Sequence, residues 1–134
     1  MSLITPQQDY SNWIEIIKRN LNNPTRNIVL IYDSDLMVGF FMYSISEKEI
    51  WNMEEIQIAN DYQSKNNIFR KLYGFLITLL PNEIKTVSAC AHIMNKKSQG
   101  ILVKLGLRRM REDQNMVFYQ GTYRDLLDWY NQVK

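Results

Sequence analysis

The sequence is poor in the residues that mark secreted and metal-binding proteins. Its 134 residues include one cysteine, Cys90, and one histidine, His92, so an internal disulfide is excluded and no metal site is expected. No apolar run approaches the roughly 18 residues of a membrane span, and segment 1–6 lacks the basic start of a signal peptide. We therefore expect a protein of the reducing cytoplasm with no membrane partner.

The sequence also lacks an excess of charge of either sign. Sixteen Lys and Arg residues against fourteen Asp and Glu residues give a formal charge of +2, which is far from the basic excess that duplex nucleic acid selects. An apolar share of 46% and an aromatic share of 12% are enough for a packed core. Since 134 residues suit one compact domain, we expect a single domain over residues 1–134 and no nucleic-acid partner.

Helical and strand periodicities alternate along the chain. Thr5 and Pro6 have the order of an N-cap followed by the first helical residue, and Thr122 is placed to cap a last helix. Asn95 is a third capping residue. The patterns predict helices after these caps and over 69–80, and strands over 27–32, 37–45, 50–59, 86–93, 107–110 and 116–119, the last two joined by a turn at 112–115. This order predicts an α/β fold with one mixed sheet flanked by helices.

Two segments carry the chemistry. The predicted central strand 50–59 runs through a polar loop into the helix at 69–80, and a loop of this kind can present backbone N–H groups to phosphate. Downstream, Asn95 opens an amphipathic helix that closes at Gly106. Together the two segments resemble the acetyl-coenzyme A signature of the GNAT-type N-acetyltransferase superfamily, and the resemblance extends over residues 28–119.

The resemblance implies a fold, a co-substrate and a set of binding residues. The fold would be GNAT-like, with a mostly antiparallel sheet and helices on both faces, and the co-substrate would be acetyl-coenzyme A. The coenzyme-binding residues would be Ile58, Gln63, Ser64, Lys65, Asn66, Asn67, Ile68 and Asn95.

Three positions depart from the superfamily pattern. Asn66 replaces a glycine, and asparagine tolerates positive φ better than most residues. Ile68 replaces a small residue, and its β-branched side chain is expected to narrow the coenzyme groove. Leu102 stands where the superfamily usually has a tyrosine acid. The phenols that remain as candidates by proximity are Tyr62, Tyr73 and Tyr119.

Acetyl transfer to an amine needs a base to take the proton of the amine. Glu54 and Glu55 lie on the central strand, and alternation predicts that they point to opposite faces, so at most one can face a shared pocket. The alternative for each is a solvated carboxylate at the sheet margin. His92 could be a base or a partly buried structural histidine, and Cys90 could be an acyl acceptor or an inert residue that fills the core.

These observations favour an N-acetyltransferase that moves acetyl directly from acetyl-coenzyme A to a small-molecule or protein amine. The departures at Asn66, Ile68 and Leu102 keep open a second interpretation, a catalytically weakened coenzyme-binding or interaction module. A third feature is the run of aromatic residues over 123–130, which in an interaction protein would form an exposed apolar patch. A homodimer is compatible with the sequence.

Overall fold

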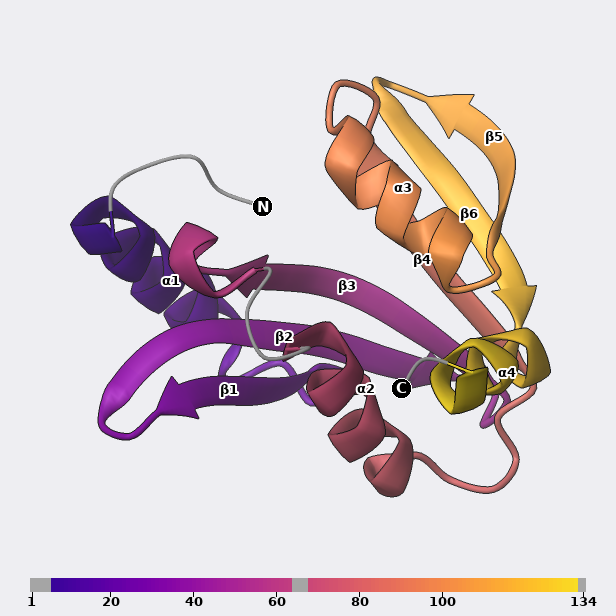
Figure 1. Ribbon diagram of the computed structural model, residues 1–134, viewed down its shortest axis with the longest axis horizontal. Helices are drawn as coiled ribbons and strands as arrows, with labels where there is room; N and C mark the ends of the chain where they lie inside the picture. The colour runs from indigo at the N-terminus through magenta and orange to yellow at the C-terminus, as the bar shows by residue number, and fades with distance from the viewer. Residues whose placement is uncertain (1–5, 64–67, 133–134) are drawn as a thin grey trace.

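The computed structural model describes residues 6–63 and 68–132. One sheet carries the fold, with helices packed against it (Figure 1). Its elements in chain order are α1 (Pro6–Asn20), β1 (Asn27–Asp33), β2 (Leu36–Ser46), β3 (Ile50–Ile58), the short 3-10 helix η1 (Asn60–Tyr62), α2 (Ile68–Leu79), β4 (Thr86–His92), α3 (Lys96–Lys104), β5 (Arg108–Asp113), β6 (Met116–Thr122) and α4 (Tyr123–Gln132).

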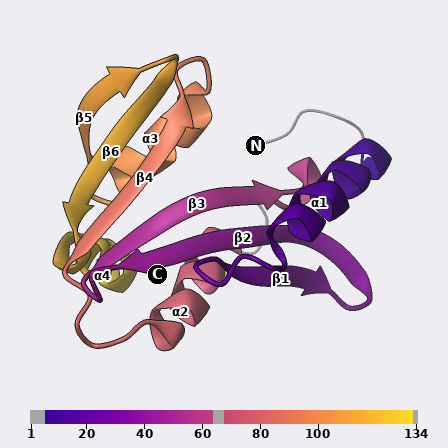
Figure 2. The same cartoon turned by 180° about the vertical axis from the view of Figure 1, so that it is seen from behind.

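The sheet consists of two antiparallel halves joined by a short parallel pairing. Its strand order is β1-β2-β3-β4-β6-β5, and β3 pairs with β4 in parallel from Ile50–Thr86 to Met53–Ala89. Beyond that point the two strands diverge, as both views show (Figures 1 and 2). The predicted mixed, mostly antiparallel α/β fold is confirmed, and β3 is the expected central strand.

Helices cover both faces of the sheet, which explains the long apolar run in β2. Phe40 and Met42 pack with Trp13 of α1 on one face, and Phe41 and Tyr43 join the core beneath α2 and α4 on the other. A strand that is buried on both faces needs apolar residues at successive positions rather than at alternate ones. Among the described helices, α1 alone lies on its face, and Figure 2 shows it in front of the sheet.

Aromatic rings hold the larger core together. Trp51 is completely buried and contacts the rings of Phe41 and Tyr43 on β2, Tyr73 on α2 and Tyr123 on α4, with centroid separations of 6.1 to 6.5 Å. Such tilted and edge-to-face pairs add stability beyond the area they bury. The start of β3 therefore ties the sheet to two helices.

The ends of the elements follow the capping signals. The Asn95 side chain accepts a 3.0 Å hydrogen bond from the Ser98 N–H and caps α3. The Thr122 hydroxyl accepts from the Asp125 N–H and caps α4. Gly106 has φ of 94°, which is favourable for glycine alone among the common residues. The turn predicted over 112–115 is narrower in the structure, because β5 continues to Asp113.

Across the ranges 6–63 and 68–132, no helix is both long enough and apolar enough to cross a bilayer.

Candidate functional site

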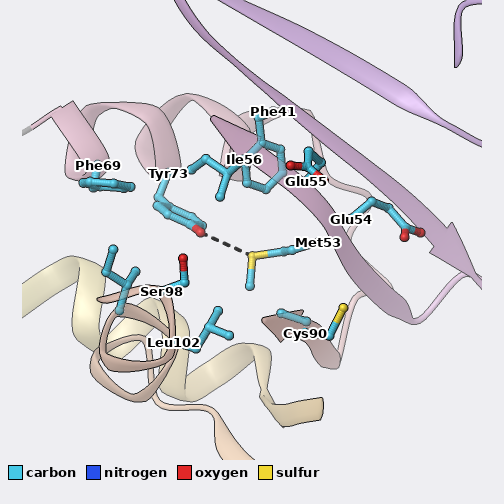
Figure 3. A pocket seen from close by; sticks show the side chains of 12 residues that line it. Phe41, Met53, Glu54, Glu55, Ile56, Phe69, Tyr73, Cys90, Ser98 and Leu102 are labelled. Atoms are coloured by element: carbon cyan, nitrogen blue, oxygen red, sulfur yellow. Dashed lines mark hydrogen bonds between the residues drawn. The ribbon is translucent and has the colours of Figure 1, made fainter. Parts of the chain in front are cut away.

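A small cavity lies where β3 and β4 diverge. We call it the inner cavity (Figure 3). Its walls come from β2, β3, β4, α2 and α3, and its volume is about 60 Å³. That volume admits a small group such as an acetyl thioester end but not a whole nucleotide coenzyme, since pockets for drug-sized ligands measure roughly 300–1,000 Å³. The lining residues are Phe41, Met53, Glu54, Glu55, Ile56, Phe69, Tyr73, Ala89, Cys90, Ser98, Ile101 and Leu102.

A β-bulge shapes the cavity wall on β3. Met42 pairs with Glu55 and the next residue of β2, Tyr43, pairs with Met53, so Glu54 is an extra residue without a partner on β2. A bulge bends its strand and changes where side chains point. It occurs directly after Met53, the last residue of β3 that pairs with β4. The bulge and the opening of the sheet therefore coincide.

The bulge overturns the expectation that Glu54 and Glu55 point to opposite faces. The Ser44 hydroxyl donates a 2.6 Å hydrogen bond to Glu54, and Ser44 lies opposite Asn52 on the face that carries α1. Glu55 pairs with Met42, which is buried on that same face. An inserted residue shifts the alternation by one position. Both carboxylates therefore lie on the face that carries α1, and both residues border the inner cavity at the gap between β3 and β4.

Cys90 lies beside the two carboxylates and does not fill the core, which was one of the two alternatives that the sequence left open. Its side chain is exposed. Partial desolvation raises the pKa of the Cys90 thiol, and the negative charges of Glu54 and Glu55 raise it further. The thiol is therefore protonated and weakly nucleophilic at neutral pH.

Among the residues that the structure describes, one phenol reaches the inner cavity. Tyr73 of α2 is buried, and its hydroxyl donates a 3.3 Å hydrogen bond to the Met53 sulfur. Figure 3 shows this hydroxyl pointing toward Met53, with Leu102 of α3 among the other cavity residues. A thioether is a weak acceptor, and burial raises the pKa of Tyr73 well above its ordinary value. The cavity thus contains a protonated hydroxyl with a weakly held hydrogen bond.

The other candidate acids and bases from the sequence have different surroundings. The Tyr62 hydroxyl donates to Asp33 at 2.7 Å, and the Tyr119 hydroxyl donates to Gln99 at 3.3 Å. His92 is exposed rather than partly buried, and its Nδ1 accepts a 3.1 Å hydrogen bond from the Met94 N–H. None of these three side chains is in the lining of the inner cavity as far as the described residues define it.

The two sequence motifs meet through Gln63. The Gln63 side chain is buried, and its amide donates a 2.8 Å hydrogen bond to the carbonyl of Ile58, the last residue of β3. Lys97, in the first turn of α3, donates to the amide oxygen of Gln63. The loop after β3 is therefore joined to the N-terminus of α3, beside the capping residue Asn95.

The remaining predicted coenzyme-binding residues divide into three groups. Ile58 is fully buried in the core. Ile68 lines a different cavity, between β1 and α2, and the narrowing of the coenzyme groove expected from its side chain stays a prediction. The predicted residues Ser64, Lys65, Asn66 and Asn67 lie outside the described residues.

Sequence reasoning missed a polar chain on the face that carries α1. Ser88 donates a 2.6 Å hydrogen bond to Asn52, Asn52 donates to Ser44, and Ser44 donates to Glu54. Arg26 lies 3.9 Å from the second oxygen of Glu54. Three neighbouring strands contribute to this chain, so only the strand order brings its members together. This series of hydrogen bonds ends at the Glu54 carboxylate, beside the gap between β3 and β4.

The hydrogen-bonded side chains from Ser88 to Glu54 lie along an open groove of about 410 Å³ on the face that carries α1. We call it the outer groove. Met53, Glu54, Ala89 and Cys90 line both the inner cavity and the outer groove. The two hollows therefore approach the gap between β3 and β4 from opposite faces of the sheet and meet at these residues. Two ligands could reach each other there.

Comparisons with known proteins identify the fold. No protein-family profile and no curated protein sequence matches the chain. An acetyltransferase from Thermus thermophilus superposes with a TM-score of 0.69 at 17% identity, over 91% of this chain and 77% of that one. The PaiA N-acetyltransferase of Thermoplasma acidophilum, solved in complex with coenzyme A, gives 0.66 at 13% identity, with 90% and 81% covered.

A GNAT family acetyltransferase from Elizabethkingia anophelis, solved with acetyl-CoA bound, gives a TM-score of 0.63 at 14% identity, with 81% of this chain and 82% of that chain covered. The match extends across most of both chains in all three comparisons. These likenesses show that the chain has the fold of the GNAT acetyltransferases, which confirms the resemblance seen in its sequence.

Proposed function

We propose that the protein transfers acetyl from acetyl-coenzyme A to an amine. The observation that carries the proposal is the meeting of two hollows from opposite faces of the sheet beside the Glu54 carboxylate. The inner cavity suits the acetyl thioester end of the donor by its small volume and largely apolar lining. Two of the structural neighbours are described as holding coenzyme A or acetyl-CoA, which supports the choice of donor.

The residues around the gap suit direct transfer. The donor supplies an activated acyl carbon, and the amine forms a C–N bond to it as the C–S bond breaks. Glu54 lines both hollows, so it is placed to accept the proton that the amine loses. The Tyr73 hydroxyl lies in the cavity, so it is placed to donate a hydrogen bond to the departing thiolate, which takes its proton from water. Protons and bonds then balance without a covalent enzyme intermediate.

Acetyl-coenzyme A is expected to raise the melting temperature of the protein by several degrees. A ligand that binds only the native state stabilises it by about 2.7 kcal/mol at a hundred times its Kd, and a domain of this size gains a few degrees per kcal/mol. Differential scanning fluorimetry at rising coenzyme concentrations measures the shift. Adenosine 5′-diphosphate, which lacks the pantetheine thioester, is the control. No shift at millimolar acetyl-coenzyme A would contradict the proposal.

A second candidate function is coenzyme binding without turnover, and Leu102 in the wall of the inner cavity favours it. Leucine cannot donate a proton where the superfamily usually has a tyrosine. Release of free thiol from acetyl-coenzyme A, followed across a panel of primary amines, separates the two functions. Transfer to any amine favours the enzyme, and a melting shift with no thiol release across the panel favours the binding module.

Replacing Tyr73 by Phe is expected to lower kcat roughly tenfold to a hundredfold, because the departing thiolate would lose its hydrogen-bond donor. The Tyr73 hydroxyl has a weak thioether acceptor, so little stability should be lost. Initial rates of thiol release at saturating concentrations of both substrates measure kcat. Tyr119→Phe is the matched control, since that buried tyrosine bonds Gln99 instead. Equal effects of the two changes would refute the role of Tyr73.

A further inference from the structure

The outer groove has one distinctive row of side chains. Cys90 of β4 pairs with Phe118 of β6, which pairs with Arg111 of β5, and Glu54 of β3 lies at the other side of Cys90 across the gap. All four residues line the outer groove. In order across the sheet, the row presents a carboxylate, a thiol, an aromatic ring and a guanidinium.

Arg111 is held over the groove by Phe118. Its guanidinium carbon lies 4.1 Å from the centroid of the Phe118 ring, a cation–π geometry that favours one placement of a long side chain. The bulge in β5 after Arg109 puts Met110 and Arg111 beside the groove, which both residues line. Neighbouring strands lie roughly 4.8 Å apart, so Arg111 is about two strand spacings from Cys90.

The guanidinium remains available to a ligand. The described partner of Arg111 is Asp113 at 3.7 Å, and both side chains of this pair are 61% exposed. An exposed ion pair of this kind contributes little free energy, so a better placed anion can replace it. An Arg fork binds carboxylate or phosphate with two parallel hydrogen bonds.

The two ends of the row have opposite charge, which selects the ligand that fits between them. We propose that the acceptor is a primary amine that carries an anionic group, separated from the amine by an apolar spacer. The amine lies at Glu54, the spacer crosses Phe118 and the anion binds Arg111. This inference rests on the proposed function, and it assigns Arg111 as the residue that selects the acceptor.

The test compares ω-aminocarboxylates from 4-aminobutanoate to 8-aminooctanoate with n-alkylamines of the same chain lengths. In the wild-type protein, at least one ω-aminocarboxylate is expected to have kcat/KM roughly tenfold to a hundredfold above its alkylamine, which is the usual value of a hydrogen bond to a charged group. Arg111→Met, which keeps an apolar stem, should abolish this preference by raising KM for the ω-aminocarboxylates. Arg111→Lys should keep part of it.

Arg109→Met is the matched control. Arg109 is on the same strand and has a similar exposed ion pair, with Glu112 at 3.4 Å, but it pairs with Tyr119, which is buried on the opposite face. The preference for the acidic amine should survive this change. If Arg109→Met removes the preference as fully as Arg111→Met does, general surface charge explains it and the assignment to Arg111 is overturned.

A binding measurement separates this inference from the proposed function. Cys90 is the single cysteine of the chain and lines the groove, so its alkylation by iodoacetamide reports occupancy without turnover. The best ω-aminocarboxylate should slow alkylation in the wild type and in Arg109→Met but not in Arg111→Met. Such protection without acetyl transfer would keep the inference and refute the function. Acetyl transfer with neither protection nor preference would keep the function and refute the inference.

Discussion

Replacing Glu54 by Gln is expected to lower kcat for acetyl transfer by roughly a hundredfold to ten-thousandfold, the range typical of a lost general base. Gln has the same shape and can still accept the hydrogen bond that Ser44 donates to Glu54, but it cannot take a proton from the amine. Because Glu54 is about one third exposed and its ion pair with Arg26 is long, folding should be little affected. Initial rates of thiol release with a saturating amine measure the loss.

Glu55→Gln is the matched control for this experiment. Glu55 is adjacent in sequence and lies on the same face of β3, yet it lines only the inner cavity and bonds Gln57 at 2.7 Å. We expect this variant to stay close to wild-type activity. A large loss in Glu55→Gln together with a normal rate in Glu54→Gln would assign the base to Glu55 and reject the role given to Glu54.

Replacing Trp51 by Ala is expected to lower the free energy of unfolding by about 3–5 kcal/mol, the usual cost of truncating a buried aromatic side chain. Trp51 is fully buried and contacts rings on β2, α2 and α4. A domain has only about 5–15 kcal/mol of stability, so this change removes a large part of it. Urea unfolding monitored by circular dichroism gives the loss as a shift in midpoint at constant slope.

Two further variants calibrate that loss. Trp51→Phe keeps a ring in the cluster and removes an indole N–H that has no hydrogen-bond partner among the described residues, so its cost should be smaller. Val103→Ala, at a residue of α3 that is 59% exposed, should change stability by no more than about 0.5 kcal/mol. If Trp51→Ala costs no more than Val103→Ala, the aromatic cluster does not have the stabilising role assigned to it.

The fold could be predicted because its signals are local. Proline, asparagine and threonine at helix starts, apolar residues at helical spacing and the central strand 50–59 all act within a few residues of each other, and the observed elements match them. The bulge at Glu54 is also visible in the spacing of apolar residues along the sequence. Apolar residues alternate at Trp51 and Met53 and then resume at Ile56 and Ile58, which is the one-residue shift that an inserted residue produces.

The candidate site was less predictable because it depends on which strands are neighbours. The order β4-β6-β5 places Phe118 between Cys90 and Arg111, and no local pattern encodes that contact. No local pattern encodes the hydrogen-bonded side chains from Ser88 to Glu54 either, because they lie on three different strands. Tyr73 was a candidate from sequence, but only the packing of α2 against β3 shows that its hydroxyl lies in the cavity.

The irregular pairing at both margins of the sheet has a consequence for aggregation. The outermost pairings, β1 with β2 and β5 with β6, each contain a register shift, and β5 is exposed along its whole length with charged residues at most positions. Bulged and charged edge strands are poor templates for the addition of another strand. The protein is thereby protected against growth of the sheet from molecule to molecule, even though both of its edges are open.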